Sequence, residues 1–203
     1  FSIPGFYLFF GMALLGSWGM KRARAWKPDI TFSGLYLVAF LLCATSFLLI
    51  EIVWMRSGLY VYPYVIEELT LFAGHYYQIP IYESGMLGLV LAGYACLHFF
   101  RNDKGETFAE RGLSGMSLSP IKRSAVRFLA IFAVINTMFM GYNIALQPFI
   151  LNADGIPKDI LERSYFMNEY CGPGADVACW NRALPISTRN SAKVNPDNQL
   201  IPG

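Results

Sequence analysis

The stretch ITFSGLYLVAFLLCATSFLLIEIV, residues 30–53, decides the fold class, because it is long and apolar enough to cross a lipid bilayer. A transmembrane helix needs about 20 mostly apolar residues, and Glu51 is the only charged residue in this stretch. Three other apolar stretches of similar length lie elsewhere in the chain. We therefore predict an all-α membrane protein with transmembrane helices at about residues 3–20, 30–54, 82–100 and 124–150.

The composition supports the same class. Apolar residue types make up 55% of the 203 residues and charged types only 15%, whereas a soluble domain is about 25% charged. The formal net charge of +2 gives no reason to expect a nucleic-acid partner, so the expected partner is the lipid bilayer. The chain starts at Phe1, almost inside a predicted helix, and we expect it to be the C-terminal part of a longer protein.

The basic residues predict the orientation of the helices. Loops rich in Lys and Arg stay in the cytoplasm. In residues 55–83, Arg56 is the only Lys or Arg residue. We therefore predict a multi-pass protein of the inner (plasma) membrane, with residues 55–83 and the C-terminal tail outside. Ten of the sixteen Lys and Arg residues lie in or beside the two connections predicted to be cytoplasmic: Lys21, Arg22, Arg24, Lys27, Arg101, Lys104, Arg111, Lys122, Arg123 and Arg127.

We divide the chain into a transmembrane domain, residues 1–151, and an extracytoplasmic tail, residues 152–203. The tail carries a pair of cysteines that predicts a disulfide. Cys171 and Cys179 are separated by seven residues that include Gly, Pro and Gly, which are turn formers. An outside compartment is oxidising and permits a disulfide. A metal site would need further Cys or His ligands, and the tail contains no His.

The connection at residues 56–81 is rich in tyrosine and predicts a segment at the membrane interface. Aromatic side chains of this kind prefer the boundary between lipid and water. Residues 65–77 are predicted to form a helix that lies on, or dips into, the outer leaflet. Such a helix would place Glu68 and His75 on one face, because residues seven apart return to nearly the same side.

Carboxylates and one histidine on the outer side are the candidate catalytic residues: Glu51, Glu67, Glu68, His75 and Glu83. An ionisable residue in a membrane span is costly and indicates a functional site. Burial raises the pKa of a carboxylic acid, which can then donate a proton near neutral pH. The alternative is that these are solvated interfacial residues, and that Glu51 is a structural partner of Arg56.

Other polar residues predict packing rather than chemistry. Asn136, Asn143 and Gln147 share one face of the last predicted helix, and such a stripe packs against other helices or lines a polar cavity. The two histidines, His75 and His98, fall on opposite sides of the membrane, and His98 is interpreted as an interface residue. We therefore expect no metal or cofactor to be bound by this chain alone.

A series of short motifs resembles a known family. The motifs are, in chain order, Tyr82-Glu83, residues 100–105, Thr107-Phe108, Glu110-Arg111-Gly112, residues 127–130, Tyr142-Asn143, Gln147, residues 163–166, residues 171–179 and Pro185-Ile186. Together they resemble the AveC-like spirocyclase family of bacterial integral membrane proteins, whose namesake closes the spiroketal rings of the avermectin polyketide. The resemblance covers residues 82–186. It departs from the family after Cys179, where Trp180-Asn181 stands in place of a Pro-Gly segment.

The resemblance implies acid/base dehydrative cyclisation of an apolar polyketide-like substrate. A general acid would protonate a hemiketal oxygen and a base would accept a proton from the attacking hydroxyl, which the five outer-side candidates could do without a metal. The alternative function is a non-catalytic structural or accessory subunit of a larger membrane complex, held by other membrane subunits. A transporter is a third interpretation, but the chain shows no inverted repeat.

Overall fold

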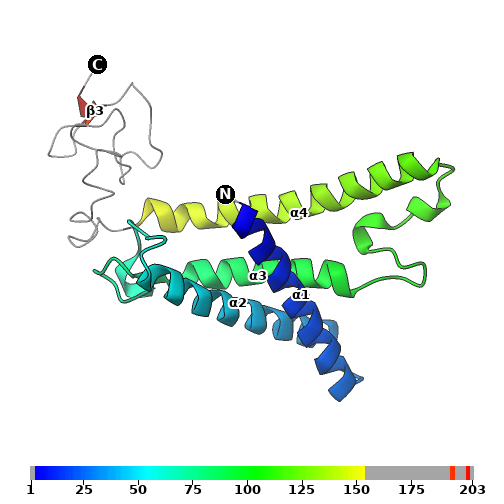
Figure 1. Ribbon diagram of the computed structural model, residues 1–203, viewed down its shortest axis with the longest axis horizontal. Helices are drawn as coiled ribbons and strands as arrows, with labels where there is room; N and C mark the ends of the chain where they lie inside the picture. Colours follow the sequence, from blue (N-terminus) through cyan, green and yellow to red (C-terminus); the bar gives the residue numbers. More distant parts are fainter. Residues whose placement is uncertain (1–2, 154–192, 195–199, 202–203) are drawn as a thin grey trace. The chain divides into compact units, whose positions relative to one another are not determined.

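The computed structural model describes residues 3–153, 193–194 and 200–201, and this part of the chain is mostly α-helical, as predicted. Each predicted span contains a helix. The first helix runs past its predicted end because residues 21–24, which are Lys, Arg, Ala and Arg, are good helix formers. The last begins at a proline, which suits a first turn. The helices are α1 (Ile3–Trp26), α2 (Phe32–Arg56), α3 (Ile81–Phe99) and α4 (Pro120–Leu151) (Figure 1).

Two of these helices, α2 and α4, are long and apolar enough to cross a membrane by length and composition. For α1 and α3, membrane crossing stays a prediction. The sidedness of the loops and tail also stays a prediction. Cys171 and Cys179 lie outside the described residues, so their disulfide is not tested.

The chain divides into two compact units. Unit 1 comprises Phe1–Ile50 and Glu83–Ala145, and unit 2 comprises Glu51–Tyr82 and Leu146–Gly203. Unit 1 therefore holds α1 together with most of α2, α3 and α4. Unit 2 holds the tyrosine-rich connection.

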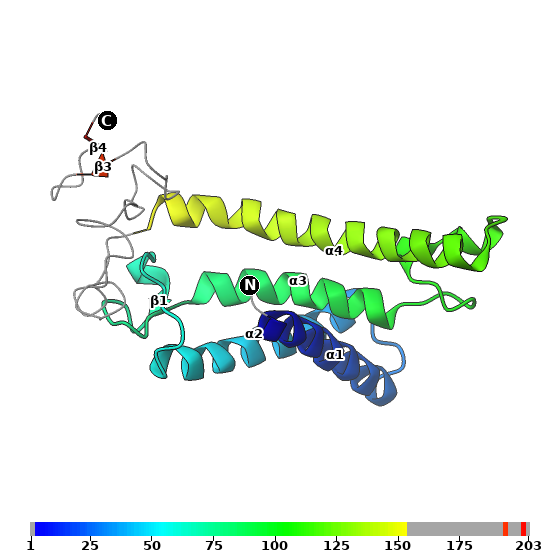
Figure 2. The ribbon, with the colours of Figure 1, turned by 45° about the horizontal axis from the view of Figure 1, so that its top comes forward.

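Small residues bring the helices of unit 1 into close contact. Figures 1 and 2 show α1 crossing α2 and α3. A Cβ atom added to Gly16 of α1 would lie 2.9 Å from the Cβ of Ala95 in α3 and 3.0 Å from the Sγ of Cys43 in α2. Small residues at such crossings let membrane helices approach closely. Two clusters of buried side chains fill the space around this crossing: Met12, Cys43, Phe47, Leu87 and Leu91, then Met20, Leu35, Ala39, Ala92 and Ala95.

Helix α4 is different, because none of its residues is buried. It contacts α3 through the Tyr94 hydroxyl, which donates to the Ile135 carbonyl oxygen at 3.1 Å. The exposed amides of Asn136 and Asn143 donate to carbonyl oxygens one turn earlier in α4, at 2.8 and 2.7 Å. The predicted packing of this polar stripe against other helices stays a prediction.

A folded loop connects α3 to α4 and contains η2 (Phe108–Glu110) and η3 (Leu113–Gly115), two short 3-10 helices. Glu106 is buried and accepts hydrogen bonds from the Asn102 side chain and the Ser114 backbone N–H, both at 2.9 Å. The hydrogen bond from Asn102 is the main reason that the pKa of Glu106 lies below its ordinary value. The charged form of Glu106 is therefore part of the loop structure.

Glu110 ties the same loop to α4. Its carboxylate accepts the Thr107 backbone N–H at 2.9 Å and pairs with the Arg127 Nε at 2.6 Å. Burial raises the pKa of Glu110, but the Thr107 hydrogen bonds and the Arg127 charge lower it more, so the net pKa lies below the ordinary value. The ionised carboxylate thus anchors the loop to the start of the last helix.

Unit 2 corrects one prediction. Residues 65–77 do not form an α-helix: η1 (Glu67–Leu69), a 3-10 helix, leads into strand β1 (Thr70–Leu71), which pairs antiparallel with β2 (Ile79–Pro80). The backbone turns at Phe72 and Gly74, which have φ angles of 56° and 83°, and a helix cannot accommodate such angles. A second small pair joins β3 (Lys193–Val194) to β4 (Leu200–Ile201).

The buried side chain of Gln78 explains why the turn wins over a helix. Its Nε2 donates to the Tyr62 carbonyl oxygen at 2.6 Å, and its Oε1 accepts the Gly74 N–H at 3.1 Å. These bonds satisfy backbone groups that a short isolated helix would otherwise have to pair. Glu68 and His75 therefore do not share a helix face.

Candidate functional site

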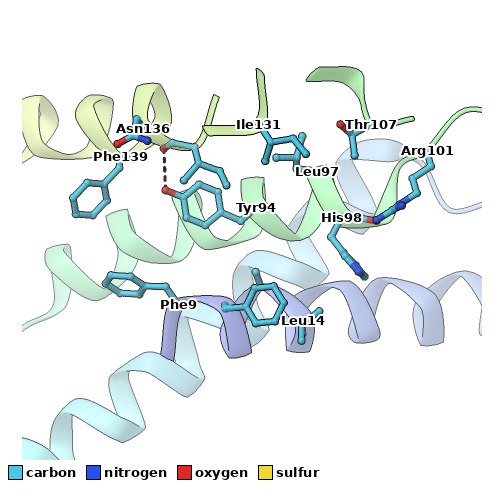
Figure 3. A pocket seen from close by; sticks show the side chains of 13 residues that line it. Phe9, Leu14, Tyr94, Leu97, His98, Arg101, Thr107, Ile131, Asn136 and Phe139 are labelled. Carbon is cyan, nitrogen blue, oxygen red and sulfur yellow. Dashed lines mark hydrogen bonds between the residues drawn. The ribbon is translucent and has the colours of Figure 1, made fainter. Parts of the chain in front are cut away.

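Unit 1 contains an apolar pocket of about 650 Å³ (Figure 3). Sites that hold drug-sized ligands span roughly 300–1,000 Å³ and combine apolar walls with a few polar groups. The walls come from α1, α3, α4 and the loop that follows α3. The lining residues are Phe9, Phe10, Ala13, Leu14, Tyr94, Leu97, His98, Arg101, Thr107, Ile131, Ile135, Asn136 and Phe139.

Three polar residues of the pocket gather at one end, whereas Asn136 lies near Phe139. Figure 3 shows His98, Arg101 and Thr107 together, away from Phe9 and Phe139. The Nδ1 of His98 is 2.8 Å from the hydroxyl of Ser17, which is 2% exposed on α1. His98 was interpreted from the sequence as an interface residue, but it lines the pocket and is held in place by a buried serine.

A carboxyl group lies next to the opposite end of the pocket. The Tyr142 hydroxyl of α4 donates a hydrogen bond to Oε1 of Glu83, in the first turn of α3. The Tyr142 ring stacks on Phe139, with ring centroids 5.5 Å apart, and Phe139 lines the pocket. Glu83 is thus one aromatic side chain removed from the cavity.

Glu51 has a similar partner within unit 2. It is 2% exposed and accepts a hydrogen bond from the Tyr62 hydroxyl. The Arg56 guanidinium, the partner that the sequence suggested for it, lies over the rings of Phe72 and Tyr77, at 5.0 and 4.6 Å. Each of the two candidate carboxylates that lie in α-helices therefore accepts a hydrogen bond from a tyrosine.

The remaining candidates lie on the surface of unit 2. Glu67 and Glu68 are adjacent and exposed in η1, and exposed His75 stacks on Tyr77 with ring centroids 5.0 Å apart. Among the described residues, no three His, Cys, Asp or Glu side chains lie close enough to hold a metal ion.

A comparison of the sequence with known protein families shows the family to which the chain belongs. The family model described as spirocyclase AveC-like matches residues 2–166. The chain belongs to this family. No curated protein and no solved structure matches the chain. Together with α2 and α4, membership in the AveC-like family indicates a membrane protein.

The family match confirms the resemblance and moves its boundaries. It begins at residue 2, so α1 and α2 belong to the AveC-like region although sequence motifs placed its start at Tyr82. It ends at residue 166, before the two cysteines of the tail. The pocket and the Glu83–Tyr142 pair both lie within the matched residues.

Three hydrogen-bond partners of the candidate residues could not be identified from the local sequence. Ser17 bonds a histidine that is 81 residues away, Tyr142 bonds Glu83 from 59 residues away, and Tyr62 lies 11 residues from Glu51. Only Tyr142 belongs to a motif that carried the family resemblance. A carboxyl group and a phenol that share a hydrogen bond can hold or transfer a proton at that position.

Proposed function

We propose that this chain is a membrane-embedded cyclase that closes rings in an apolar, polyketide-like substrate by acid/base dehydration. The observation that carries the proposal is the apolar pocket of about 650 Å³ in a member of the spirocyclase AveC-like family. An apolar substrate dissolved in the bilayer can enter such a pocket without crossing water. In this proposal the proton comes from a carboxyl group that the Tyr142–Phe139 stack links to the cavity.

The reaction needs no oxidant. One hydroxyl of a dihydroxyketone adds to the carbonyl and gives a hemiketal. The acid protonates the hemiketal hydroxyl, which leaves as water, and the second hydroxyl then attacks the oxocarbenium ion and loses its proton to the base. The product is a spiroketal and one water. Enclosure of the chain in a shaped pocket selects one diastereomer.

Glu83 is the proposed acid and base, and Tyr142 is its positioning residue. Of the carboxylates predicted from the sequence, Glu83 is the one in unit 1 with the pocket, and the Tyr142–Phe139 stack links it to the cavity. Glu51, buried against Tyr62 in unit 2, is the second candidate. The remaining candidates for the acid or base are the exposed residues of unit 2: Glu67, Glu68 and His75.

The test is cyclisation of a long-chain dihydroxyketone by the purified protein in lipid nanodiscs, with products separated by chiral chromatography. Loss of a general acid slows a reaction roughly 100- to 10,000-fold, so we expect Glu83→Gln to fall by such a factor. Asp29→Asn, an exposed carboxylate of unit 1, is the matched control and should keep full activity. Full activity in both Glu83→Gln and Glu51→Gln would remove the acid/base mechanism.

A second function, an accessory subunit of a larger membrane complex, is favoured by α4. This helix has no buried residue and exposes large apolar side chains such as Phe128 and Phe132 beside Asn136. Under this proposal other membrane subunits cover α4. Subunits that co-purify in fixed ratio after gentle extraction would support it, and a stable isolated protein that cyclises substrate would count against it.

The proposed location is the inner (plasma) membrane, with the two basic connections in the cytoplasm and the tail outside. The positive charge of those connections supports this orientation. Reporter fusions after residues 104 and 203 test it: a cytoplasmic reporter should be active at the first position and inactive at the second. The reverse pattern would invert the topology.

A further inference from the structure

We propose that the His98 end of the pocket binds the carboxylate of a single-chain amphiphile, so that the substrate is an apolar chain with a terminal acid. This inference deepens the proposed function, since it names the substrate class of the same pocket. It rests on that function only in taking the bound molecule to be the substrate.

The charge of this end is the first support. Among the described residues, Arg101 is the only charged one that lines the pocket. Its Nε donates to the His98 carbonyl oxygen at 3.3 Å, which holds the guanidinium near the end of α3. Among the described residues, no carboxylate forms an ion pair with Arg101. The charged groups that act most strongly on His98 are Arg101 and Lys21, both cations. A ligand carboxylate placed here meets the positive charge of Arg101, and Arg binds carboxylates through two parallel hydrogen bonds.

Two acidic side chains of the loop, Glu106 and Glu110, have partners of their own. Glu110 is paired with Arg127 at 2.6 Å, and Glu106 accepts the Asn102 side-chain amide at 2.9 Å. They are therefore engaged by the loop rather than by Arg101, although the Arg101 charge also acts on Glu110. A bound carboxylate would complete this charge arrangement.

His98 is oriented for the same purpose. The buried Ser17 hydroxyl lies 2.8 Å from Nδ1 of the ring, so Nε2 is the nitrogen with which a ligand can form a hydrogen bond. Ser17 is a positioning residue in this account. Figure 3 shows His98 and Arg101 side by side at the same end of the cavity.

The size and lining of the pocket select one chain. A volume of about 650 Å³ is that of a site for one drug-sized molecule, not for the two acyl chains of a phospholipid. The walls away from Arg101 are apolar apart from Tyr94 and Asn136, and Phe9 and Phe139 lie at the far end (Figure 3). With its acid at Arg101, the chain extends toward Phe139 and hence toward Glu83, where ring closure is proposed. The acid and the reacting groups are thus at opposite ends of the substrate.

The experiment measures binding of palmitic acid and of methyl palmitate, which differ by the negative charge, to the full chain in non-ionic detergent. Both compete against a palmitic acid that carries a diazirine near its tail, and the labelled residues are mapped by mass spectrometry. We expect the acid to bind about tenfold more tightly than the ester, the factor of one charge-assisted contact. We also expect labelling of Phe139 or its neighbours.

Variants give the matched comparison. Arg101→Gln should abolish the preference for the acid, and Ser17→Ala should reduce the acid-to-ester ratio without loss of folded protein. Arg111→Gln removes an exposed arginine of the same loop that does not line the pocket, and it should keep the full preference. Equal binding of acid and ester by the unaltered chain, or an unchanged preference in Arg101→Gln, would overturn the proposal.

Two further arms separate this proposal from its alternatives. If two-chain phosphatidic acid competes more strongly than palmitic acid, the pocket is a lipid headgroup site and the proposal is wrong. Glu83→Gln should bind palmitic acid as the unaltered chain does. If the unaltered chain cyclises its substrate but binds acid and ester equally, only the carboxylate site is wrong. If it prefers the acid but does not cyclise, only the cyclase proposal is wrong.

Discussion

The contact between α2 and α3 at Gly88 yields a quantitative prediction. In Gly88→Ala the new Cβ would lie 2.6 Å from the Cβ of Ala44 and 3.0 Å from its Cα. Carbon atoms pack best at about 3.5–4.0 Å, so the two helices must separate by about 1 Å at this point. Overpacking of this kind costs about 1–3 kcal/mol, and alanine returns about 1 kcal/mol through its higher helix propensity.

Gly85→Ala is the matched control on the same helix, because a Cβ at Gly85 meets nothing within 4 Å. It gains the same propensity without the clash, so the difference between the two variants isolates the packing penalty, about 1–3 kcal/mol. The assay is unfolding in detergent micelles titrated with sodium dodecyl sulfate and followed by circular dichroism. If Gly88→Ala unfolds at the same denaturant fraction as Gly85→Ala, the close helix contact in unit 1 is wrong.

Three further predictions concern the loops. The pKa of Glu110 is lowered in the folded state, so its ionised carboxylate stabilises the α3–α4 loop. This contribution is complete above the ordinary carboxyl pKa of about 4.3 and is lost as the pH falls through the folded-state pKa. Glu110→Gln should therefore weaken the acid dependence of amide hydrogen exchange in the loop, and an unchanged dependence would contradict the Arg127 pairing. Gln78→Ala removes the hydrogen bonds to the Tyr62 carbonyl oxygen and the Gly74 N–H and should cost about 1–3 kcal/mol in the unfolding free energy of unit 2; exchange rates that do not change there would refute this role. Burial raises the pKa of Tyr64 to about 12, so its contribution to stability is complete below pH about 10 and is lost as the pH rises through the folded-state pKa. Tyr64→Phe should remove one tyrosine from the part of the absorbance titration near pH 12, and an unchanged titration there would be the contrary result.

The helices could be predicted because bilayer-length apolar stretches admit few other structures. A membrane core offers backbone groups no water to bond, so a stretch such as residues 30–53 must pair its own amides in a helix. The ends of the helices were predicted less accurately, because the basic residues after Met20 extend α1 into the connection between α1 and α2. Sequence periodicity does not show where a solvated end of a helix stops.

The polar segments were harder to predict because their structure depends on distant partners. The turn at Phe72 and Gly74 is held by Gln78 and by the backbone of Tyr62, which hydropathy does not detect. The pocket likewise forms only when α1, α3 and α4 meet, and the pairing of Ser17 with His98 follows from that meeting. Glu83 was identified from its residue type and place in a span, but its tyrosine partner came only from the fold.

The most direct test of the account is native mass spectrometry of the protein extracted gently from its own membrane, compared with Ala13→Phe. Ala13 lines the pocket and is 7% exposed, so a phenyl group there fills part of the cavity. We predict a monomer or homo-oligomer that carries one apolar small molecule, and loss of that molecule in Ala13→Phe. A protein that appears only with other subunits in fixed ratio, with no bound molecule to lose, would contradict the cyclase and favour the accessory subunit.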